Sequence, residues 1–217
     1  MKTQADIIIF DLDGTLVDSS KDMAWAVDRT FEEIGIEKQS FEKIKSAIGW
    51  GVTNFIKELV PQITPEDLDH GRRTFLRIYG ERIHVDTHYY DGVEELLEKF
   101  LSEGKKLAIA TNKHIGMTED LLQSMGERHK FSIVLGADSV ENRKPHPEAP
   151  LRIIKELGGD PRRTVFVGDS SLDMASGKGA GTVTVGAVYG YRGREDLEGA
   201  SPDYLIDSFS ELRGIIA

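Results

Sequence analysis

The 217-residue chain contains no cysteine. Disulfide bonds, metal sites built on thiolates and cysteine nucleophiles are therefore excluded. The chain also has no apolar run that approaches the roughly 18 residues of a membrane-spanning helix. The run nearest the amino terminus, Ile7–Phe10, is too brief for a signal peptide, so we expect a cytoplasmic protein.

Basic residues are fewer than acidic ones. Lysine and arginine number 27 against 37 aspartates and glutamates, and the formal net charge is −10 at pH 7. Because nucleic acids and anionic membrane surfaces attract proteins of the opposite charge, we expect neither as a partner. A small anionic substrate remains compatible with the acidic chain, since a bound divalent cation can reverse the local field. A monomer and a homodimer are equally compatible with this composition.

Short runs of β-branched and aromatic residues indicate buried strands. They are Ile7–Phe10, Leu107–Ala110, Thr164–Val167 and Val183–Val185, with a weaker run at Ile133–Leu135. Helical patterns lie between them, at Asp91–Leu101 and at Pro147–Leu157, where Leu151, Ile154 and Leu157 share a stripe. Strands that alternate with helices predict an α/β fold with a doubly wound parallel sheet.

Residues 16–89 break this alternation. Their apolar residues recur at helical spacings and form no evident buried strand. The four stripes are Met23, Val27, Phe31 and Ile34; Phe41, Ile44 and Ile48; Phe55, Ile56 and Leu59; and Leu68, Phe75 and Tyr79. We therefore predict a helical cap domain at residues 16–89, inserted into an α/β core domain formed by residues 1–15 and 90–217.

Polar residues follow the predicted strands, where ligands bind in open parallel sheets. These residues are Asp11 and Asp13 after the first strand, Thr111, Asn112 and Lys113 after the run at 107–110, Lys144 in the loop after 133–135, and Asp169 and Asp173 after 164–167. We expect them to meet at one edge of the sheet. The alternative is that the aspartates only cap the helices that follow, that Lys144 is a solvated loop residue, and that Thr111 and Asn112 are ordinary turn residues.

Three carboxylates in one crevice would repel one another unless a cation shared the site. With no cysteine and no clear histidine cluster, the oxygen ligands favour Mg²⁺ over zinc. Thr111 and Lys144 would then supply a hydrogen bond and a positive charge to phosphoryl oxygens. This set of groups is suited to phosphoryl transfer.

Four segments resemble the signatures of the haloacid dehalogenase-like (HAD) phosphatases, in the order of that family. They are Asp11–Ser19, with the sequence DLDGTLVDS, then Thr111–Lys113, Lys144–Pro147 and Gly168–Asp173. The resemblance covers nearly the whole chain. It implies a Rossmann-like core and a helical cap that closes over a small substrate.

The resemblance also implies roles for the residues. Asp11 would be the nucleophile that forms an aspartyl-phosphate, and Asp13 would protonate the leaving alcohol and then activate water. Dehalogenases lack the second aspartate, so Asp13 favours phosphate esters over carbon–halogen bonds. The implied Mg²⁺ ligands are Asp11, the Asp13 carbonyl and Asp169, with support from Asp173, and the implied phosphate-binding groups are Thr111, the Asn112 backbone and Lys144.

Within the family, Thr111–Lys113 and Gly49–Gly51 look most like phosphoglycolate phosphatases. Gly49–Gly51 either approaches the substrate or is a simple turn between helices. Tyr90–Gly92 and Lys178 depart from the usual pattern of these relatives, which leaves the substrate open. A β-phosphoglucomutase-like phosphotransferase, a pyrophosphatase and a non-catalytic Mg²⁺-binding module remain alternatives.

Two further groups of residues have both a plain and a functional interpretation. His84, Asp86 and His88 alternate along the chain, either as surface residues or as metal ligands. Arg72, Arg73, Arg77 and Arg82 form either a solvated helix face or a surface that attracts an anionic substrate.

Overall fold

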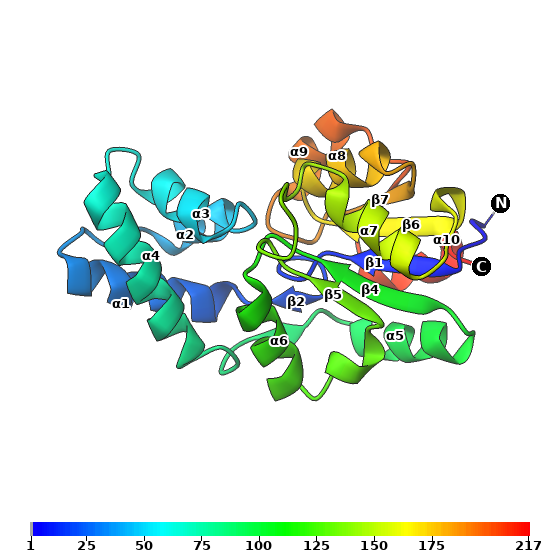
Figure 1. Ribbon diagram of the computed structural model, residues 1–217, viewed down its shortest axis with the longest axis horizontal. Coiled ribbons are helices and arrows are strands. Elements are labelled where there is room, and N and C mark those ends of the chain that lie inside the picture. Colours follow the sequence, from blue (N-terminus) through cyan, green and yellow to red (C-terminus); the bar gives the residue numbers. More distant parts are fainter. Residues whose placement is uncertain (1) are drawn as a thin grey trace.

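Six parallel strands form the central sheet of the computed structural model, which describes residues 2–217 (Figure 1). In spatial order they are β5 (Ile133–Leu135), β4 (Lys106–Ala110), β1 (Ile7–Phe10), β6 (Thr164–Gly168), β7 (Val183–Ala187) and β8 (Tyr204–Ile206). The predicted α/β fold with a parallel sheet is confirmed, and each of the five predicted runs forms a strand. The sixth strand, β8, was not predicted, because three residues at the edge of a sheet make too short a pattern.

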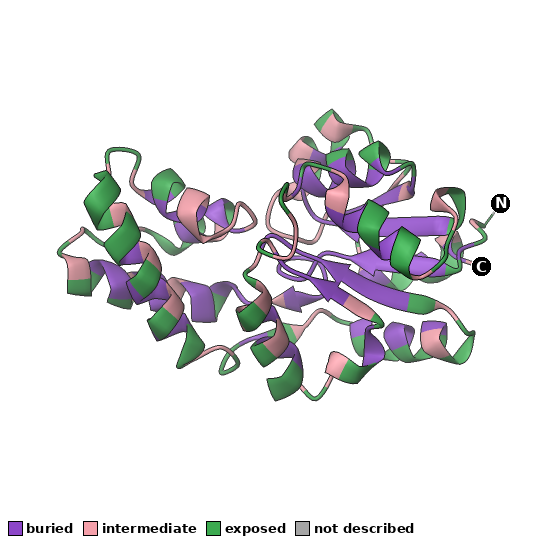
Figure 2. Ribbon diagram, in the orientation of Figure 1, coloured by how far each residue is buried: buried purple, intermediate pink, exposed green. Residues whose placement is uncertain are grey.

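The side chains of β1 alternate between two apolar cores. Ile8 and Phe10 pack on one face with α5 (Val93–Ser102), α6 (Ile115–Ser124) and α10 (Leu212–Ile215). Ile7 and Ile9 pack on the other face with α7 (Glu148–Glu156). Next to α7 lies α8 (Ser171–Gly179), which is followed by α9 (Gly193–Ala200) (Figure 1). Burial on both faces explains why β1 is a continuous apolar run (Figure 2).

Helix α7 confirms the helix predicted at 147–157 but not its buried face. Leu151 is 44% exposed, whereas Ile153 and Ile154 are buried against the sheet. The predicted stripe of Leu151, Ile154 and Leu157 was therefore wrong in part. Helical spacing defines several possible stripes, and packing against β1 and β4 selects one of them.

Four helices form a separate layer beside the sheet (Figure 1). These cap helices are α1 (Ser20–Ile34), α2 (Phe41–Ala47), α3 (Val52–Leu59) and α4 (Pro65–Gly80). They have an apolar core of their own, in which the Phe75 ring lies 5.7 Å from Phe55 and stacks on Tyr79 at 5.5 Å. Phe41, predicted to be buried, is 41% exposed because it is the first residue of α2.

A short ribbon precedes α1 and follows α4. Strand β2 (Val17–Asp18) pairs antiparallel with β3 (His88–Tyr89), so the chain enters and leaves the cap helices side by side. Residues 16–89 are thus not wholly helical, and this two-residue pairing carries no pattern that a sequence could reveal. The division into a cap at 16–89 and a core at 1–15 and 90–217 stays a prediction. No helix within residues 2–217 is long and apolar enough to span a membrane.

Candidate functional site

The carboxyl ends of three neighbouring strands carry polar side chains that lie close together. Asp11 follows β1, Thr111 follows β4 and Asp169 follows β6, and all three are buried. The amide of Asp11 donates to Val167 O at 2.9 Å, and the amide of Thr111 donates to Leu135 O at 3.0 Å. The sheet's hydrogen bonding therefore continues past the strand ends and holds these residues in place.

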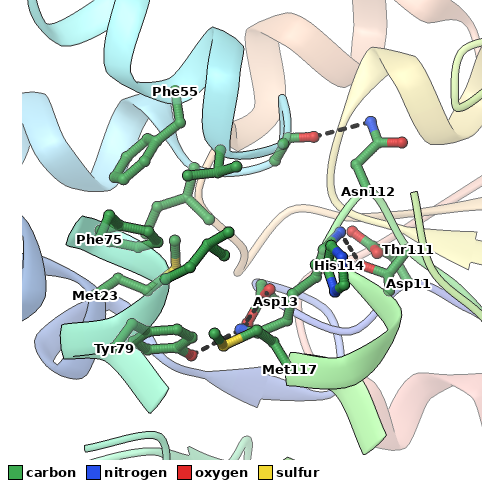
Figure 3. Close-up of a pocket in the computed structure, with 16 residues that line it drawn as sticks. Asp11, Asp13, Met23, Phe55, Phe75, Tyr79, Thr111, Asn112, His114 and Met117 are labelled. Carbon is green, nitrogen blue, oxygen red and sulfur yellow. Dashed lines mark hydrogen bonds and ion pairs between the residues drawn. The ribbon is translucent and has the colours of Figure 1, made fainter. Parts of the chain in front are cut away.

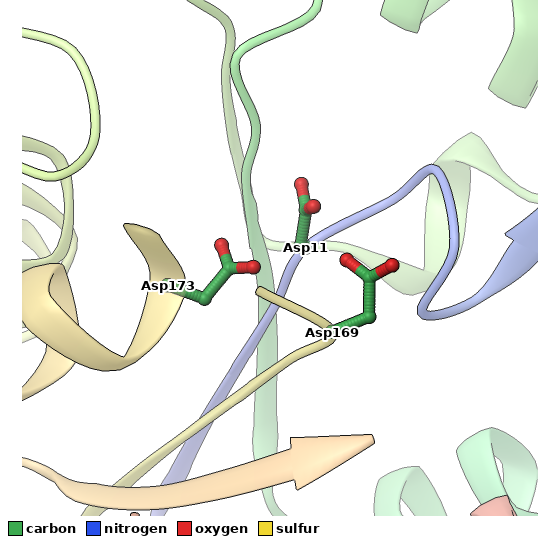
Figure 4. Close-up of side chains that lie close together, drawn as sticks. All are labelled: Asp11, Asp169 and Asp173. Atoms are coloured by element: carbon green, nitrogen blue, oxygen red, sulfur yellow. The ribbon is translucent and has the colours of Figure 1, made fainter. Parts of the chain in front are cut away.

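Asp11, Asp169 and Asp173 form a buried cluster of carboxylates (Figure 4). One oxygen from each lies within 4.8 Å of the others, and the part of the chain that the structure describes has no second cluster of this kind. Burial raises the pKa of Asp11 to about 6, although the Lys144 ammonium acts against it. Burial, followed by the charges of Asp173 and Asp11, raises the pKa of Asp169 well above its ordinary value.

The raised pKa values of Asp11 and Asp169 mean that the cluster needs a positive charge to keep its carboxylates ionised. The charged carboxylates are costly here because they are buried and because they repel one another. A hard divalent cation with oxygen ligands, such as Mg²⁺, would remove both costs. The donor set therefore fits Mg²⁺.

Lys144 lies among the acids. Its Nζ is 2.8 Å from Asp11 Oδ1 and 2.6 Å from Asp173 Oδ1, and its side chain is buried. Burial would lower the pKa of Lys144, but the charges of Asp11 and Asp173 outweigh it and hold the pKa above its usual range. The site thus contains a permanent ammonium, which can bind a phosphoryl oxygen.

Asp173 and Asp169 are fixed by their own hydrogen bonds. Asp173 Oδ2 accepts from the Ser170 amide at 3.1 Å while the Ser170 hydroxyl accepts from the Asp173 amide at 3.4 Å, and these two bonds form the capping box of α8. The Ser170 hydroxyl also donates to Asp173 Oδ2 at 2.5 Å. Asp169 Oδ2 accepts from the Tyr191 amide at 2.7 Å. Gly14 has a φ of +87°, and a Cβ there would overlap the Asp169 carboxylate. The turn after β1 therefore needs glycine both for its backbone and for space.

Asp13 has different surroundings. Its Oδ1 accepts from the Ser19 hydroxyl at 2.5 Å and from Lys113 Nζ at 2.9 Å. Lys113 Nζ also donates to the Tyr79 hydroxyl at 2.7 Å. Since Tyr79 belongs to α4, this chain of contacts links Asp13 to the cap helices. Burial raises the pKa of Tyr79 to about 12, which keeps its phenol neutral.

A small cavity separates this edge of the sheet from the cap helices (Figure 3). Its volume is about 50 Å³. The polar lining consists of Asp11, Asp13, Tyr79, Thr111, Asn112, Lys113 and His114, and the apolar lining of Met23, Ile48, Val52, Phe55, Phe75, Leu76 and Met117. The polar groups come mainly from the ends of the strands and the apolar wall mainly from the cap helices.

The turn at Gly49–Gly51 contacts the sheet side of this cavity. Asn112 Nδ2 donates to Gly49 O at 3.0 Å, and Arg192 Nη2 donates to Ile48 O at 3.0 Å. The Arg192 guanidinium also lies over the Trp50 ring, 5.5 Å from its centre. Gly49 and Gly51 line the cavity, so this turn both joins two helices and borders the space for a ligand.

Other candidates lie outside the site. His84, Asp86 and His88 form no metal-binding cluster within the described residues 2–217. The arginines of the basic run pair with acids: Arg72 and Arg73 with Asp69, Arg77 with Glu33 and Glu81, and Arg82 with Asp22 and Asp86. None of them lines the cavity.

Sequence reasoning gave no role to several residues that the structure places at the site. Lys113 was expected at this edge of the sheet with Thr111 and Asn112 but was given no role, and Ser19 was noted only within the first signature. Tyr79 was taken only as part of an apolar stripe. Tyr191 and Arg192 carried no signal, because they reach the site only through the fold.

The chain is similar to known proteins in sequence and in fold. The family model of haloacid dehalogenase-like hydrolases matches residues 8–187. A phosphoglycolate phosphatase from Haemophilus influenzae is 33% identical over 100% of both chains. One from Vibrio parahaemolyticus is 34% identical over 99% of this chain and 98% of its own.

The fold has a close match among solved structures. The crystal structure of a predicted phosphoglycolate phosphatase from Haemophilus somnus superposes with a TM-score of 0.92, at 30% identity over 98% of each chain. The family expected from four short signatures is therefore confirmed over the length of the chain. This chain belongs to the haloacid dehalogenase-like hydrolases.

Proposed function

We propose that the chain is a Mg²⁺-dependent phosphatase that cleaves a small, phosphoglycolate-like monoester through an aspartyl-phosphate on Asp11. By its family and its relatives, the chain is a phosphoric monoester hydrolase. The observation that carries the finer proposal is the contact of buried Asp11 with Lys144, inside a cluster of carboxylates that borders a small cavity.

Mg²⁺ would be held by Asp11, Asp169 and the Asp13 carbonyl. Asp173 would support the site from the side, because its two oxygens are engaged by Lys144 and Ser170. When bound, the ion would neutralise the carboxylates and the negative charge of the phosphate.

The chain's own residues account for the chemistry. The Asp11 carboxylate attacks phosphorus, and the bond from phosphorus to the alcohol oxygen breaks. Asp13 gives its proton to that oxygen, then takes a proton from the water that attacks the aspartyl-phosphate. Phosphate leaves and the Asp11 carboxylate is restored. Throughout, Lys144 and Thr111 hold the oxygens of the phosphoryl group that do not react.

The Asp11→Asn variant tests this mechanism against the alternative of a non-catalytic Mg²⁺-binding module, which would show no turnover in wild type either. We expect at least a roughly thousandfold loss of kcat for 2-phosphoglycolate and for p-nitrophenyl phosphate, because an amide is a poor nucleophile. Asp28→Asn, on the outer face of α1, is the matched control and should keep full activity. Comparable rates for wild type and Asp11→Asn would contradict the proposal.

Two other activities use the same aspartate pair. A β-phosphoglucomutase-like enzyme would return the phosphate to sugar, and a pyrophosphatase would cleave an anhydride. Incubation with glucose 1-phosphate and with pyrophosphate distinguishes them from a monoester phosphatase. We expect no glucose 6-phosphate and slower turnover of pyrophosphate than of 2-phosphoglycolate.

A further inference from the structure

Resting on the phosphatase function proposed above, we propose that Lys113 selects the substrate by binding a carboxylate on the carbon next to the ester oxygen. The preferred substrate is then the phosphate ester of a short 2-hydroxy acid whose remaining substituents are apolar. Lys113 is thereby a specificity residue, distinct from Lys144, which contacts Asp11 and Asp173.

Lys113 lies where the alcohol half of a substrate must go. It lines the cavity, its side chain is only 7% exposed, and its Nζ is 2.9 Å from Asp13 Oδ1. Asp13 must come within hydrogen-bond distance of the ester oxygen in order to protonate it. A carboxylate attached one carbon beyond that oxygen is therefore within reach of the Lys113 ammonium.

The ammonium has a donor to spare for such a carboxylate. It carries three N–H groups. Lys113 Nζ lies 2.9 Å from Asp13 Oδ1 and 3.1 Å from Asp13 Oδ2, so one N–H can be shared between these two oxygens. A second N–H serves the Tyr79 hydroxyl at 2.7 Å, which leaves the third for a ligand. Tyr79 also places its ring 4.6 Å from Lys113 Nζ, so the cap helices fix where this charge points.

Within residues 2–217, the other lysines and arginines do not line this cavity. Among the described residues that line the cavity, Lys113 is the one lysine or arginine. His114 also lines it, but its Nδ1 accepts from the Gly116 amide at 3.2 Å and its Nε2 lies 3.0 Å from Asp138 Oδ2. Since both ring nitrogens are engaged, a substrate anion on this side of the cavity must go to Lys113.

The apolar wall restricts the rest of the substrate. Phe55, Phe75, Leu76 and Met117 offer no hydrogen-bond partner to a hydroxyl group. A buried hydroxyl without a partner loses its hydration and gains nothing in return. Sugar phosphates and other polyhydroxylated esters are therefore disfavoured, whereas a methyl substituent is tolerated.

The test compares 2-phosphoglycolate with ethyl phosphate, which has a methyl group in place of the carboxylate. The measured quantity is the ratio of their kcat/KM values, because any loss that Lys113 causes through Asp13 affects both substrates and cancels. Wild type should prefer 2-phosphoglycolate. Lys113→Met should lower the ratio about ten- to hundredfold, as expected for the loss of a charged hydrogen bond.

Two further variants complete the design. Lys57→Met removes an exposed lysine of α3 and should leave the ratio unchanged. Tyr79→Phe, which removes one partner of Lys113, should lower the ratio by a smaller factor. If Lys113→Met does not fold, the ratio measured for Tyr79→Phe still tests the role of Lys113.

The possible outcomes are separable. Equal losses for both substrates in Lys113→Met, or a wild type without preference for 2-phosphoglycolate, would overturn this inference and leave the phosphatase proposal intact. Failure of wild type to hydrolyse any monoester with Mg²⁺ would instead overturn the proposed function. Slower hydrolysis of 2-phospholactate than of 2-phosphoglycerate would contradict the selectivity assigned to the apolar wall, since these two esters differ by one hydroxyl.

Discussion

Two residues apart in the chain, Asp11 and Asp13 have different electrostatic surroundings. Asp11 lies 2.8 Å from Lys144 and close to the carboxylates of Asp169 and Asp173. This concentration of negative charge favours the binding of a cation next to Asp11. Asp13 lies away from that cluster and pairs with Lys113 and Ser19. One short turn thereby offers two carboxylates for two tasks.

Asp13→Asn tests the role proposed for Asp13. The amide cannot donate a proton to an alkoxide, so we expect hydrolysis of alkyl phosphates to fall by about 10²–10⁴. p-Nitrophenyl phosphate, whose leaving group needs little protonation, should lose much less. Steady-state rates for both substrates decide the question, and equal losses would count against a general acid at this position.

Among the secondary-structure elements, the first turn of α1 anchors the chain where it leaves α4. The buried Asp22 carboxylate accepts from the amides of residues 85–87 at 2.8–3.1 Å and from the Thr87 hydroxyl at 2.8 Å. Arg82 adds an ion pair at 3.1 Å. A single carboxylate thus holds together the two segments that border the β2–β3 ribbon.

Asp22→Asn should destabilise the protein by about 1–3 kcal/mol, because buried donors lose a charged acceptor. Asp28→Asn, on the same helix and partly exposed, is the control and should change the free energy of unfolding by less than about 0.5 kcal/mol. Urea unfolding monitored by circular dichroism measures both. Equal stabilities of the two variants would contradict the anchoring role of Asp22.

The Asp22 carboxylate also predicts how the stability of the protein depends on pH. Burial would raise the pKa of Asp22, but the Thr87 hydroxyl and the amides of residues 85–87 outweigh it and hold the pKa below its ordinary value. The stability that Asp22 contributes is therefore present above the ordinary pKa of about 4 and lost as the pH falls through the folded value. Wild type should lose more stability than Asp22→Asn below about pH 4.

For the whole molecule, the buried acids oppose folding unless a cation is bound. The pKa of Asp11 is about 6 in the folded protein against 3.8 ordinarily. A carboxyl with a raised pKa binds its proton more tightly when folded, so its contribution to stability falls as the pH rises from about 4 to about 6. Without metal, Asp11 and Asp169 should therefore cost stability at neutral pH.

Mg²⁺ should relieve this cost. At a hundredfold excess over Kd we expect the Tm to rise by roughly 5–10 °C at neutral pH. The rise should be smaller at pH 5, where protons compete for the carboxylates. Calorimetry with EDTA or with Mg²⁺ measures the shift, and Asp169→Asn should reduce it. An equal Tm with and without Mg²⁺ would contradict the proposed metal site.

The sequence by itself determined the strands buried on both faces and the cap helices. Both follow from local patterns: a continuous apolar run for β1 and spacings of three and four residues for α1–α4. It also placed polar residues at the carboxyl ends of β1, β4 and β6, because parallel strands end at the same edge. The family followed from four short signatures in order.

Only the tertiary structure decided which residues meet. Lys113 and Tyr79 are 34 residues apart and Asp22 and Thr87 are 65 apart, and no local pattern encodes such pairs. The same holds for the β2–β3 ribbon, the edge strand β8 and the exposure of Leu151, which depend on neighbours supplied by the fold. Local spacing specifies an element, whereas packing between elements specifies which of its faces is buried and which side chains line the cavity.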